Sequence, residues 1–152
     1  MLARKERTTL EVRQWLAEKG ADEDQIGDLI ERLEEALVLD DERFAVEFAR
    51  DKRELSGWGR TRIGKALAER GIANDLIEEV TSEAEGTEVE RATEILLSRG
   101  FRLDDPADRR RALGLLGRRG YAAEDAYEAV RQVARSGGLD LAGADGSEEF
   151  GQ

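Results

Sequence analysis

The sequence of 152 residues contains no cysteine and no histidine. Without cysteine there can be no disulfide framework, an absence that fits a cytoplasmic protein. Without histidine or cysteine, the usual transition-metal ligands, the Ser-His-Asp and Cys-His nucleophile systems and the commonest general base are excluded. Hydrolysis by carboxylates alone and a magnesium site stay open. We therefore expect no enzyme, no catalytic or metal-binding residue and no cofactor.

Proline, aromatic residues and long apolar runs are also scarce. Pro106 is the only proline, so little in the sequence would break a long helix. No apolar run approaches the roughly 20 residues that a membrane-spanning helix needs, and the first residues lack the apolar stretch of a signal peptide. Charged and hydrophobic residues each make up 39% of the chain, which is enough apolar material to fold. These features predict a soluble, all-helical protein.

The net charge of −11 is spread unevenly along the chain. Acidic residues outnumber basic ones by 11 to 6 over residues 3–40, and after residue 137 only acidic residues carry charge. Residues 85–136 are balanced. Neutralisation of phosphates supplies most of the affinity of non-specific nucleic-acid binding. A chain this acidic is therefore expected to bind nucleic acid poorly, except through local basic patches.

The most informative feature that is present is a short unit that occurs three times and ends at a glycine. The closing glycines, Gly20, Gly71 and Gly120, are 51 and then 49 residues apart. At twelve, eight, four and one residues before them stand, in turn, a capping type, two apolar residues and a cation: Thr8, Gly59 and Asp108; Val12, Ile63 and Ala112; Leu16, Leu67 and Leu116; Lys19, Arg70 and Arg119. Each unit predicts a short amphipathic helix, capped at its start and ended by a cation and a left-handed glycine.

A period of this length marks an array of repeated supersecondary units. Apolar residues at helical spacing predict further helices around the three units. Reciprocal capping boxes mark three of the predicted helix starts: Thr8 with Glu11, Asp22 with Gln25, and Thr87 with Glu90. We predict four parts: a first repeat of two helices that lacks its opening helix (1–40), two three-helix repeats (41–86 and 87–135) and a disordered acidic tail (136–152). Because a single three-helix unit buries little surface, the repeats are expected to stack in an elongated, curved array.

Several motifs have a functional and a structural interpretation. The pairs Asp40–Asp41 and Asp104–Asp105 suggest metal or acid–base chemistry, but each stands at a turn or helix start, and capping is favoured. Gly57–Gly59 with the following arginine lacks the spacing of a phosphate loop, so it is interpreted as a linker between helices. Three aromatic residues at core spacing are expected to pack: Phe44, Phe48 and Tyr127.

Two clusters of cations stand out in this acidic chain. Runs of cations on helices are usually solvated faces, but here the cations recur around the short helices of the second and third repeats. Trp58 lies outside every apolar stripe, and Trp and Arg are enriched where proteins bind each other; contact with a partner and packing over the linker both stay open for it. The candidate partner-binding residues are Arg50, Lys52, Arg53, Trp58, Arg60, Arg62, Lys65, Arg109, Arg110, Arg111, Arg118 and Arg119.

In the order of its motifs, the chain resembles the RecX family, the regulators of the RecA recombinase. The resemblance covers roughly residues 3–135 and rests on the following stretches: Thr8–Val12, Leu16–Gly20, Leu39–Ala45, Gly57–Ile63, Leu67–Ile72 and Arg118–Tyr121. It implies a protein without enzymatic activity, built of three tandem three-helix repeats. It also implies binding to the RecA filament on single-stranded DNA, along its groove, with restraint of strand exchange, ATP hydrolysis and SOS co-protease activity.

Two departures from the family qualify this expectation. Many members have another helix before the position of Thr8, so this chain looks shortened at its start. The net charge of −11 favours contact with RecA over contact with DNA. We therefore expect a monomeric cytoplasmic regulator that binds RecA filaments, with weak direct DNA contact at most and no membrane contact. A helical module that binds nucleic acid directly, and a plain structural scaffold, are the alternatives.

Overall fold

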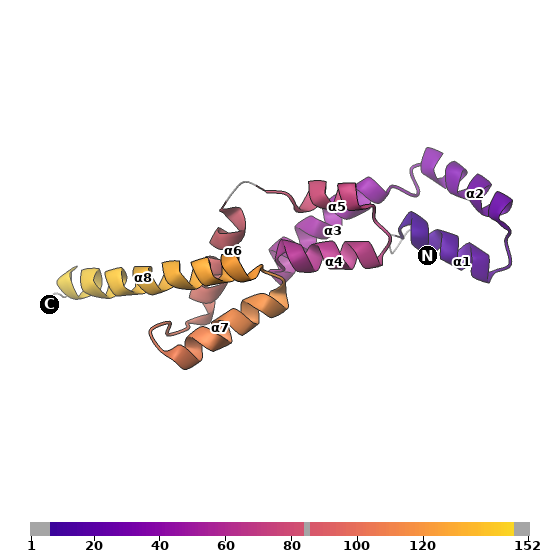
Figure 1. Cartoon of the computed structure of the whole chain (residues 1–152). Helices are drawn as coiled ribbons and strands as arrows, with labels where there is room; N and C mark the ends of the chain where they lie inside the picture. The colour runs from indigo at the N-terminus through magenta and orange to yellow at the C-terminus, as the bar shows by residue number, and fades with distance from the viewer. Residues whose placement is uncertain (1–6, 84–85, 148–152) are drawn as a thin grey trace. The chain divides into compact units, whose positions relative to one another are not determined.

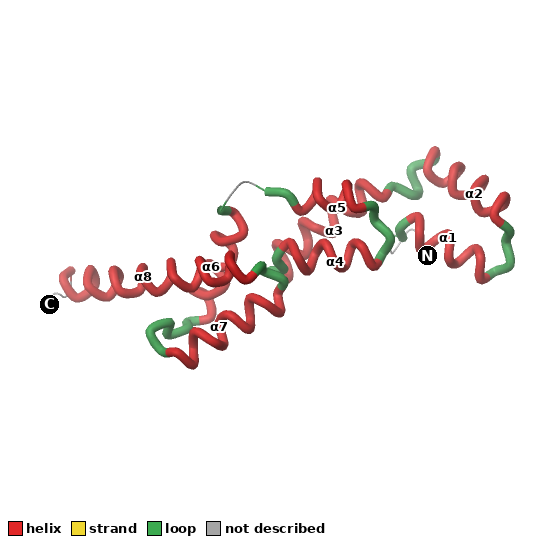
Figure 2. Tube along the Cα trace, viewed as in Figure 1, coloured by secondary structure: helices red, strands yellow, loops and turns green. Residues whose placement is uncertain are grey.

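The computed structural model describes residues 7–83 and 86–147, and side chains as far as residue 137. These residues form eight α-helices and no strand (Figures 1 and 2), which confirms the all-helical prediction. The helices are α1 (Thr9–Glu18), α2 (Glu23–Glu35), α3 (Asp41–Ser56), α4 (Arg60–Glu69), α5 (Asn74–Thr81), α6 (Thr87–Arg99), α7 (Pro106–Arg119) and α8 (Ala123–Ser147). Residues before Arg7, where the opening helix of the first repeat would begin, lie outside the described part.

The chain divides into two compact units. The first contains the described residues up to Ser56 together with Ile63–Ser82, and the second contains Gly57–Arg62 with the described residues from Glu83 onward. The first turn of α4 is thus assigned to the second unit and the rest of the helix to the first. Among the described helices, none is both long and apolar enough to cross a membrane.

All three short helices end in the way that the repeat predicts. The closing glycines have φ values of +95°, +89° and +96°, a left-handed conformation that costs glycine no Cβ clash. After each glycine, the next backbone N–H donates to the carbonyl of the leucine four residues before the glycine. These bonds run from Ala21 to Leu16 at 3.1 Å, from Ile72 to Leu67 at 3.0 Å and from Tyr121 to Leu116 at 3.0 Å. This is the Schellman pattern, and it confirms the predicted register at atomic detail.

Two of the three predicted capping boxes are present. Thr8 caps α1 and Asp22 caps α2, each in reciprocal contact with the residue three positions later. The third prediction is wrong: α6 begins at Thr87 itself, after Gly86 with φ of +91°, and has no side-chain cap. The helix thus starts one residue earlier than a Thr87 cap would require. Glu88 in its first turn is buried and paired with Arg91.

The start of α7 also differs from the prediction. Asp108 was expected to cap it, but the cap is Asp105, which accepts a hydrogen bond from the backbone of Ala107 at 3.1 Å. Pro106 occupies the first helical position, where its fixed φ favours the helix and its missing N–H costs nothing. Asp108 instead accepts a bond from the backbone N–H of Arg102 at 2.8 Å. The other pair behaves as expected, because Asp40 accepts a bond from the backbone of Arg43 at 3.0 Å.

Helix α8 continues well past the point where disorder was predicted to begin. It extends to Ser147, so helix replaces the predicted disorder over residues 136–147, and residues 148–152 are not described. The glycines of this stretch weaken a helix by only about 1 kcal/mol each relative to alanine. No proline follows Pro106 to end the helix. Lack of apolar periodicity was therefore a poor guide to where this helix stops.

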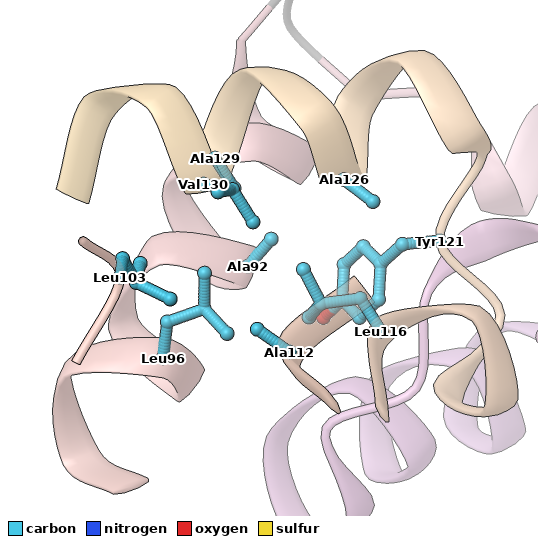
Figure 3. Packing of buried hydrophobic residues seen from close by; sticks show 9 residues of the cluster. All are labelled: Ala92, Leu96, Leu103, Ala112, Leu116, Tyr121, Ala126, Ala129 and Val130. Carbon is cyan, nitrogen blue, oxygen red and sulfur yellow. The ribbon is translucent and has the colours of Figure 1, made fainter. Parts of the chain in front are cut away.

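The last three helices enclose the largest described core (Figure 3). Its buried side chains come from α6, α7, α8 and the adjoining turns: Ala92, Leu96, Leu103, Ala112, Leu116, Tyr121, Ala126, Ala129 and Val130. In Figure 3, Ala92 and Leu96 of α6 lie on the side of Ala129 and Val130 of α8, and Leu116 and Tyr121 pack beside them. Tyr127 was predicted to pack as well, but its side chain is 53% exposed. At 100° per residue it is turned about 100° around α8 from Ala126, at the edge of the buried face.

A smaller core lies between α1 and α2. It consists of Val12, Leu16, Ile26, Ile30 and the following Leu39, all buried. In α3, Phe44 is buried and its ring lies 5.5 Å from that of Phe48, as predicted. Other large apolar residues of the helices are exposed, including Leu55 at 82% and Leu97 at 62%. Helical periodicity identifies the apolar face of a helix, but it does not show which residues of that face another helix covers.

Candidate protein-interaction site

The start of α1 is bonded to the end of α4 in the first unit, a contact that we call the first joint. The hydroxyl of Thr8, twelve residues before Gly20, donates to the carbonyl of Arg70 at 2.5 Å. The Arg70 guanidinium grips the Glu11 carboxylate with two hydrogen bonds of 2.7 and 2.8 Å. A Cβ on Gly71 would lie only 2.3 Å from the Cβ of Leu10, so the closing glycine leaves room for the incoming helix.

The start of α4 is bonded to the end of α7 in the same manner within the second unit, which we call the second joint. The backbone N–H of Gly59, twelve residues before Gly71, donates to the carbonyl of Arg119 at 2.7 Å. The N–H of Thr61 donates to the carbonyl of Gly120 at 3.1 Å. A Cβ on Gly120 would lie 2.2 Å from the Cβ of Arg62. In both joints, the positive start of one helix thus meets the negative end of another.

Ionic contacts reinforce both joints. At the first, the hydrogen bond from Arg70 lowers the pKa of the Glu11 carboxylate. At the second, one carboxylate oxygen of Glu88 accepts a bond from the backbone N–H of Arg60 at 3.1 Å, and Glu88 is paired with Arg91. Burial alone would lower the pKa of Arg91, but its ion pairs outweigh burial and raise it. The starts of α1 and α4 are therefore held by charge-assisted bonds.

Tyr121 completes the second joint from the core side. Its ring is buried at 4% exposure, and its hydroxyl donates to the carbonyl of Gly57 at 3.1 Å. Burial raises the pKa of the phenol, so it stays a protonated donor at neutral pH. The loop Gly57–Gly59 is in this way tied to the last repeat, which supports its interpretation as a structural linker.

The second joint brings together four of the candidate residues, from both cationic clusters. The guanidinium carbon of Arg62 lies 4.0 Å from the centre of the Trp58 ring. The same guanidinium donates to the carbonyl of Arg118 at 3.0 Å. A guanidinium nitrogen of Arg119 lies over Gly57, 2.5 Å from where a Cβ would stand. We call Trp58, Arg62, Arg118 and Arg119 the Trp58 cluster.

Several of the other eight candidates have structural contacts of their own. Arg53 donates to the carbonyl of Val80, and Arg109 donates to the carbonyl of Leu103 at 2.9 Å. The Lys52 ammonium lies 5.4 Å from the centre of the Phe48 ring. The remaining five are exposed cations on α3, α4 and α7, two of which have an acidic neighbour, Asp51 for Arg50 and Asp108 for Arg111: Arg50, Arg60, Lys65, Arg110 and Arg111. A role of these eight residues in binding a partner stays a prediction.

Sequence reasoning missed an acidic cavity in the second unit. Its volume is about 470 Å³, and it is lined by Arg60, Glu83, Gly86, Glu88, Val89, Glu124, Asp125, Glu128 and Arg131. Five carboxylates against two guanidiniums make it unsuited to an anionic ligand. No group of three possible metal ligands occurs within the described part of the chain. The spacing of Glu124 and Glu128 on one face of α8 was the available signal, but their neighbours come from distant segments.

Comparison with known proteins identifies relatives along most of the chain. Residues 40–80 match the second three-helix domain of RecX, and residues 1–33 match its first three-helix domain. The regulatory protein RecX of Halorhodospira halophila is 39% identical over 133 residues, which cover 86% of this chain and 81% of that protein. The regulatory protein RecX of Mycolicibacterium vanbaalenii is 31% identical over 140 residues, or 86% and 76% of the two chains.

Solved structures share the fold. A crystal structure of RecX from Lactobacillus salivarius superposes with a TM-score of 0.70 at 19% identity, covering 87% of this chain and 88% of that one. A second crystal structure, of a regulatory protein RecX, superposes with a TM-score of 0.69 at 20% identity and covers 86% and 66% of the two chains. At this level of identity the likeness concerns the fold alone. The tandem arrangement of three-helix units is thus shared with these proteins.

Proposed function

This chain belongs to the RecX family of regulatory proteins, and we propose that it regulates the RecA recombinase by binding the RecA filament on single-stranded DNA. Binding would inhibit or modulate strand exchange, ATP hydrolysis and SOS co-protease activity in recombinational repair. The protein would act by occupying surface on the filament and not by catalysis. Family membership is the observation that carries this proposal.

Within the chain, the Trp58 cluster is the part that we propose contacts RecA. Trp and Arg are the residues that most often dominate binding energy at protein interfaces. Arg62 is stacked on Trp58 and bonded to the Arg118 carbonyl, so little side-chain freedom is lost when a partner binds it. The cluster is cationic in a chain of net charge −11. Its expected counterpart is therefore an acidic surface of RecA.

The central test measures the ATPase activity of RecA on single-stranded DNA, and sedimentation of this protein with RecA filaments. Arg118→Glu reverses one exposed charge of the cluster without removing the Arg118 carbonyl that holds Arg62. Loss of a contact of this kind costs about 1–2 kcal/mol, so we expect roughly 5- to 30-fold weaker binding. Arg99→Glu is the matched control, because Arg99 is also an exposed cation in the last turn of a helix.

The outcomes separate cleanly. Inhibition of the ATPase by the wild type, weakened by Arg118→Glu and unchanged by Arg99→Glu, supports both the function and the surface. Equal effects of the two variants would remove the Trp58 cluster from the proposal while leaving the family function in place. No change in RecA ATPase activity at a several-fold excess of the wild type would refute the function itself.

A direct nucleic-acid-binding function is the second candidate, and one observation favours it. An aromatic ring stacked with arginine beside further arginines is a common platform for single-stranded nucleic acid. The double variant Arg60→Glu with Arg62→Glu distinguishes the two functions. If it abolishes binding to naked single-stranded DNA but keeps RecA inhibition, the two activities are separate, RecA is the regulatory target and the Trp58 cluster is not the surface that contacts RecA. Circular dichroism would verify that the variant keeps its helices, since Arg62 also contributes to the second joint.

A further inference from the structure

The end of α1 has the features of the two joints but receives no helix start from the described residues. Gly20 closes α1 with φ of +95°, and no atom lies within 4 Å of the position that its Cβ would take. At Gly71 and Gly120 the corresponding distances are 2.3 and 2.2 Å, because another helix start is packed there. The closing turns at Gly71 and Gly120 are thus each in contact with the start of another helix, whereas the turn at Gly20 is open.

The open turn also keeps its hydrogen-bond acceptor available. In the filled joints, the carbonyl one residue before the closing glycine accepts a bond from the residue that starts the next helix, as Arg70 does from Thr8 and Arg119 does from Gly59. The equivalent carbonyl in α1 belongs to Lys19, and it accepts no bond from any residue in the described ranges. A carbonyl at the negative end of a helix is a favourable acceptor for the first N–H or hydroxyl groups of another helix.

An exposed tryptophan stands beside this turn. Trp15 lies five residues before Gly20 and is 52% exposed, with the Lys19 ammonium 5.7 Å from its ring centre. Leu115 holds the corresponding position in α7 and is 9% exposed. The end of α1 therefore carries a large apolar side chain at a position that is covered in the complete last repeat. Exposed aromatic residues of this kind are typical of binding surfaces.

From these observations we propose that the end of α1, defined by Trp15, Lys19 and Gly20, is a docking surface for the first turn of a helix supplied by a partner protein. The filled first joint specifies the chemistry of that helix. Its start has Ser or Thr as the cap, bonded to the Lys19 carbonyl, and Glu three residues later, paired with the Lys19 ammonium. An apolar residue between them packs on Gly20, as Leu10 packs on Gly71.

A second copy of this chain does not supply the helix. The equivalent start in the last repeat is that of α7, which extends to Pro106 and is closed by its own residues. Asp105 accepts the bond from Ala107, and Asp108 accepts one from Arg102. The end of α1 is consequently open, whereas the start of α7 is closed by its own residues, and this asymmetry disfavours head-to-tail chains of this protein.

The test uses the full chain labelled with ¹⁵N and two stapled helical peptides of equal length. One peptide begins with Thr and has Glu three residues later; the other keeps the Thr and has Lys in place of the Glu. We expect the first peptide to shift the Trp15 indole signal and the amide signals of Lys19, Gly20 and Ala21. One ion pair with an exposed lysine contributes at most about 1 kcal/mol, so the second peptide should bind about fivefold more weakly.

Charge exchange makes the test specific to Lys19. Lys19→Glu should weaken the Glu peptide about fivefold and restore binding of the Lys peptide, whereas the control Arg32→Glu, on α2, should change neither affinity. Equal affinity for both peptides, shifts spread over the whole chain or no shift at millimolar peptide would each overturn the proposal. If the Trp15 and Lys19 signals instead move with the concentration of the protein alone, the occupant is a second copy and the proposal is wrong.

Discussion

At the scale of single residues, Leu37 is the clearest departure from ordinary backbone geometry. It follows Ala36, the residue that caps the end of α2. It has φ of +61°, and its side chain is 67% exposed. A left-handed conformation costs an L-residue about 1–2 kcal/mol. Leu37→Gly should therefore raise the free energy of unfolding by about 0.5–1 kcal/mol, after allowing for the greater freedom of glycine in the unfolded chain. Urea denaturation measures this, and Val38→Gly, where φ is not positive, should lower stability instead.

The ion pair of Glu11 and Arg70 makes a second prediction at this scale. The hydrogen bond from Arg70 holds the pKa of Glu11 below its usual value of 4.5. A lowered folded-state pKa contributes stability above the unfolded-state pKa, and this contribution is lost as the pH falls through the folded-state value. Glu11→Gln should therefore cost about 1–2 kcal/mol at pH 7, and less as the pH approaches 3.

Urea unfolding between pH 3 and pH 7 tests this dependence. Glu23→Gln is the matched control, since Glu23 is also paired with an arginine, Arg13, at 3.1 Å but its side chain is 83% exposed. Exposed pairs contribute little, so the control should follow the wild-type curve closely. A Glu11→Gln curve parallel to that of the wild type over the whole pH range would contradict the role given to this ion pair.

At the scale of the secondary-structure elements, the joints explain why two closing glycines should be more sensitive than the third. Gly20→Ala and Gly71→Ala both place alanine at φ near +90°, which costs about 1–2 kcal/mol. Gly71→Ala in addition forces a Cβ into Leu10 at 2.3 Å, whereas the space beside Gly20 is open. We expect the second variant to be the less stable by at least about 1 kcal/mol. If urea unfolding gave the same loss of stability for both variants, the first joint would be able to accommodate the added Cβ without destabilisation, and the prediction would be wrong.

At the scale of the whole molecule, the net charge determines how tightly the protein is expected to bind DNA. The Trp58 cluster offers three cations, and each phosphate neutralised on a single strand contributes about −0.7 to the slope of log K against log salt. We expect a slope no steeper than about −2 and weak binding, with Kd around 100 µM or above, at physiological salt. Fluorescence anisotropy of a labelled single strand between 50 and 300 mM salt measures both values.

Variants connect this measurement to the cluster. Arg118→Glu should make the slope shallower by about 0.7, and Arg99→Glu should leave it unchanged. Micromolar binding with a steep slope would contradict the expectation drawn from the charge of −11. It would favour direct nucleic-acid binding as the function of the Trp58 cluster.

Features that depend on neighbours within a few residues could be read from the sequence. The three closing turns, the caps at Thr8 and Asp22 and the all-helical class all follow from contacts between residues up to five positions apart, and the structure contains each of them. Similar local signals misplaced the starts of α6 and α7. There, Gly86 with its left-handed φ and Asp105 followed by Pro106 occupy the cap positions instead of Thr87 and Asp108.

What the tertiary structure alone decided is which helix end meets which helix start. Thr8 bonds to Arg70, 62 residues away, and Tyr121 bonds to Gly57, 64 residues away. No local pattern encodes such a pairing, because it results from the packing of whole helices. The sequence by itself established three copies of one closing turn. Only the fold showed that two are occupied and that the third, at Gly20, is open.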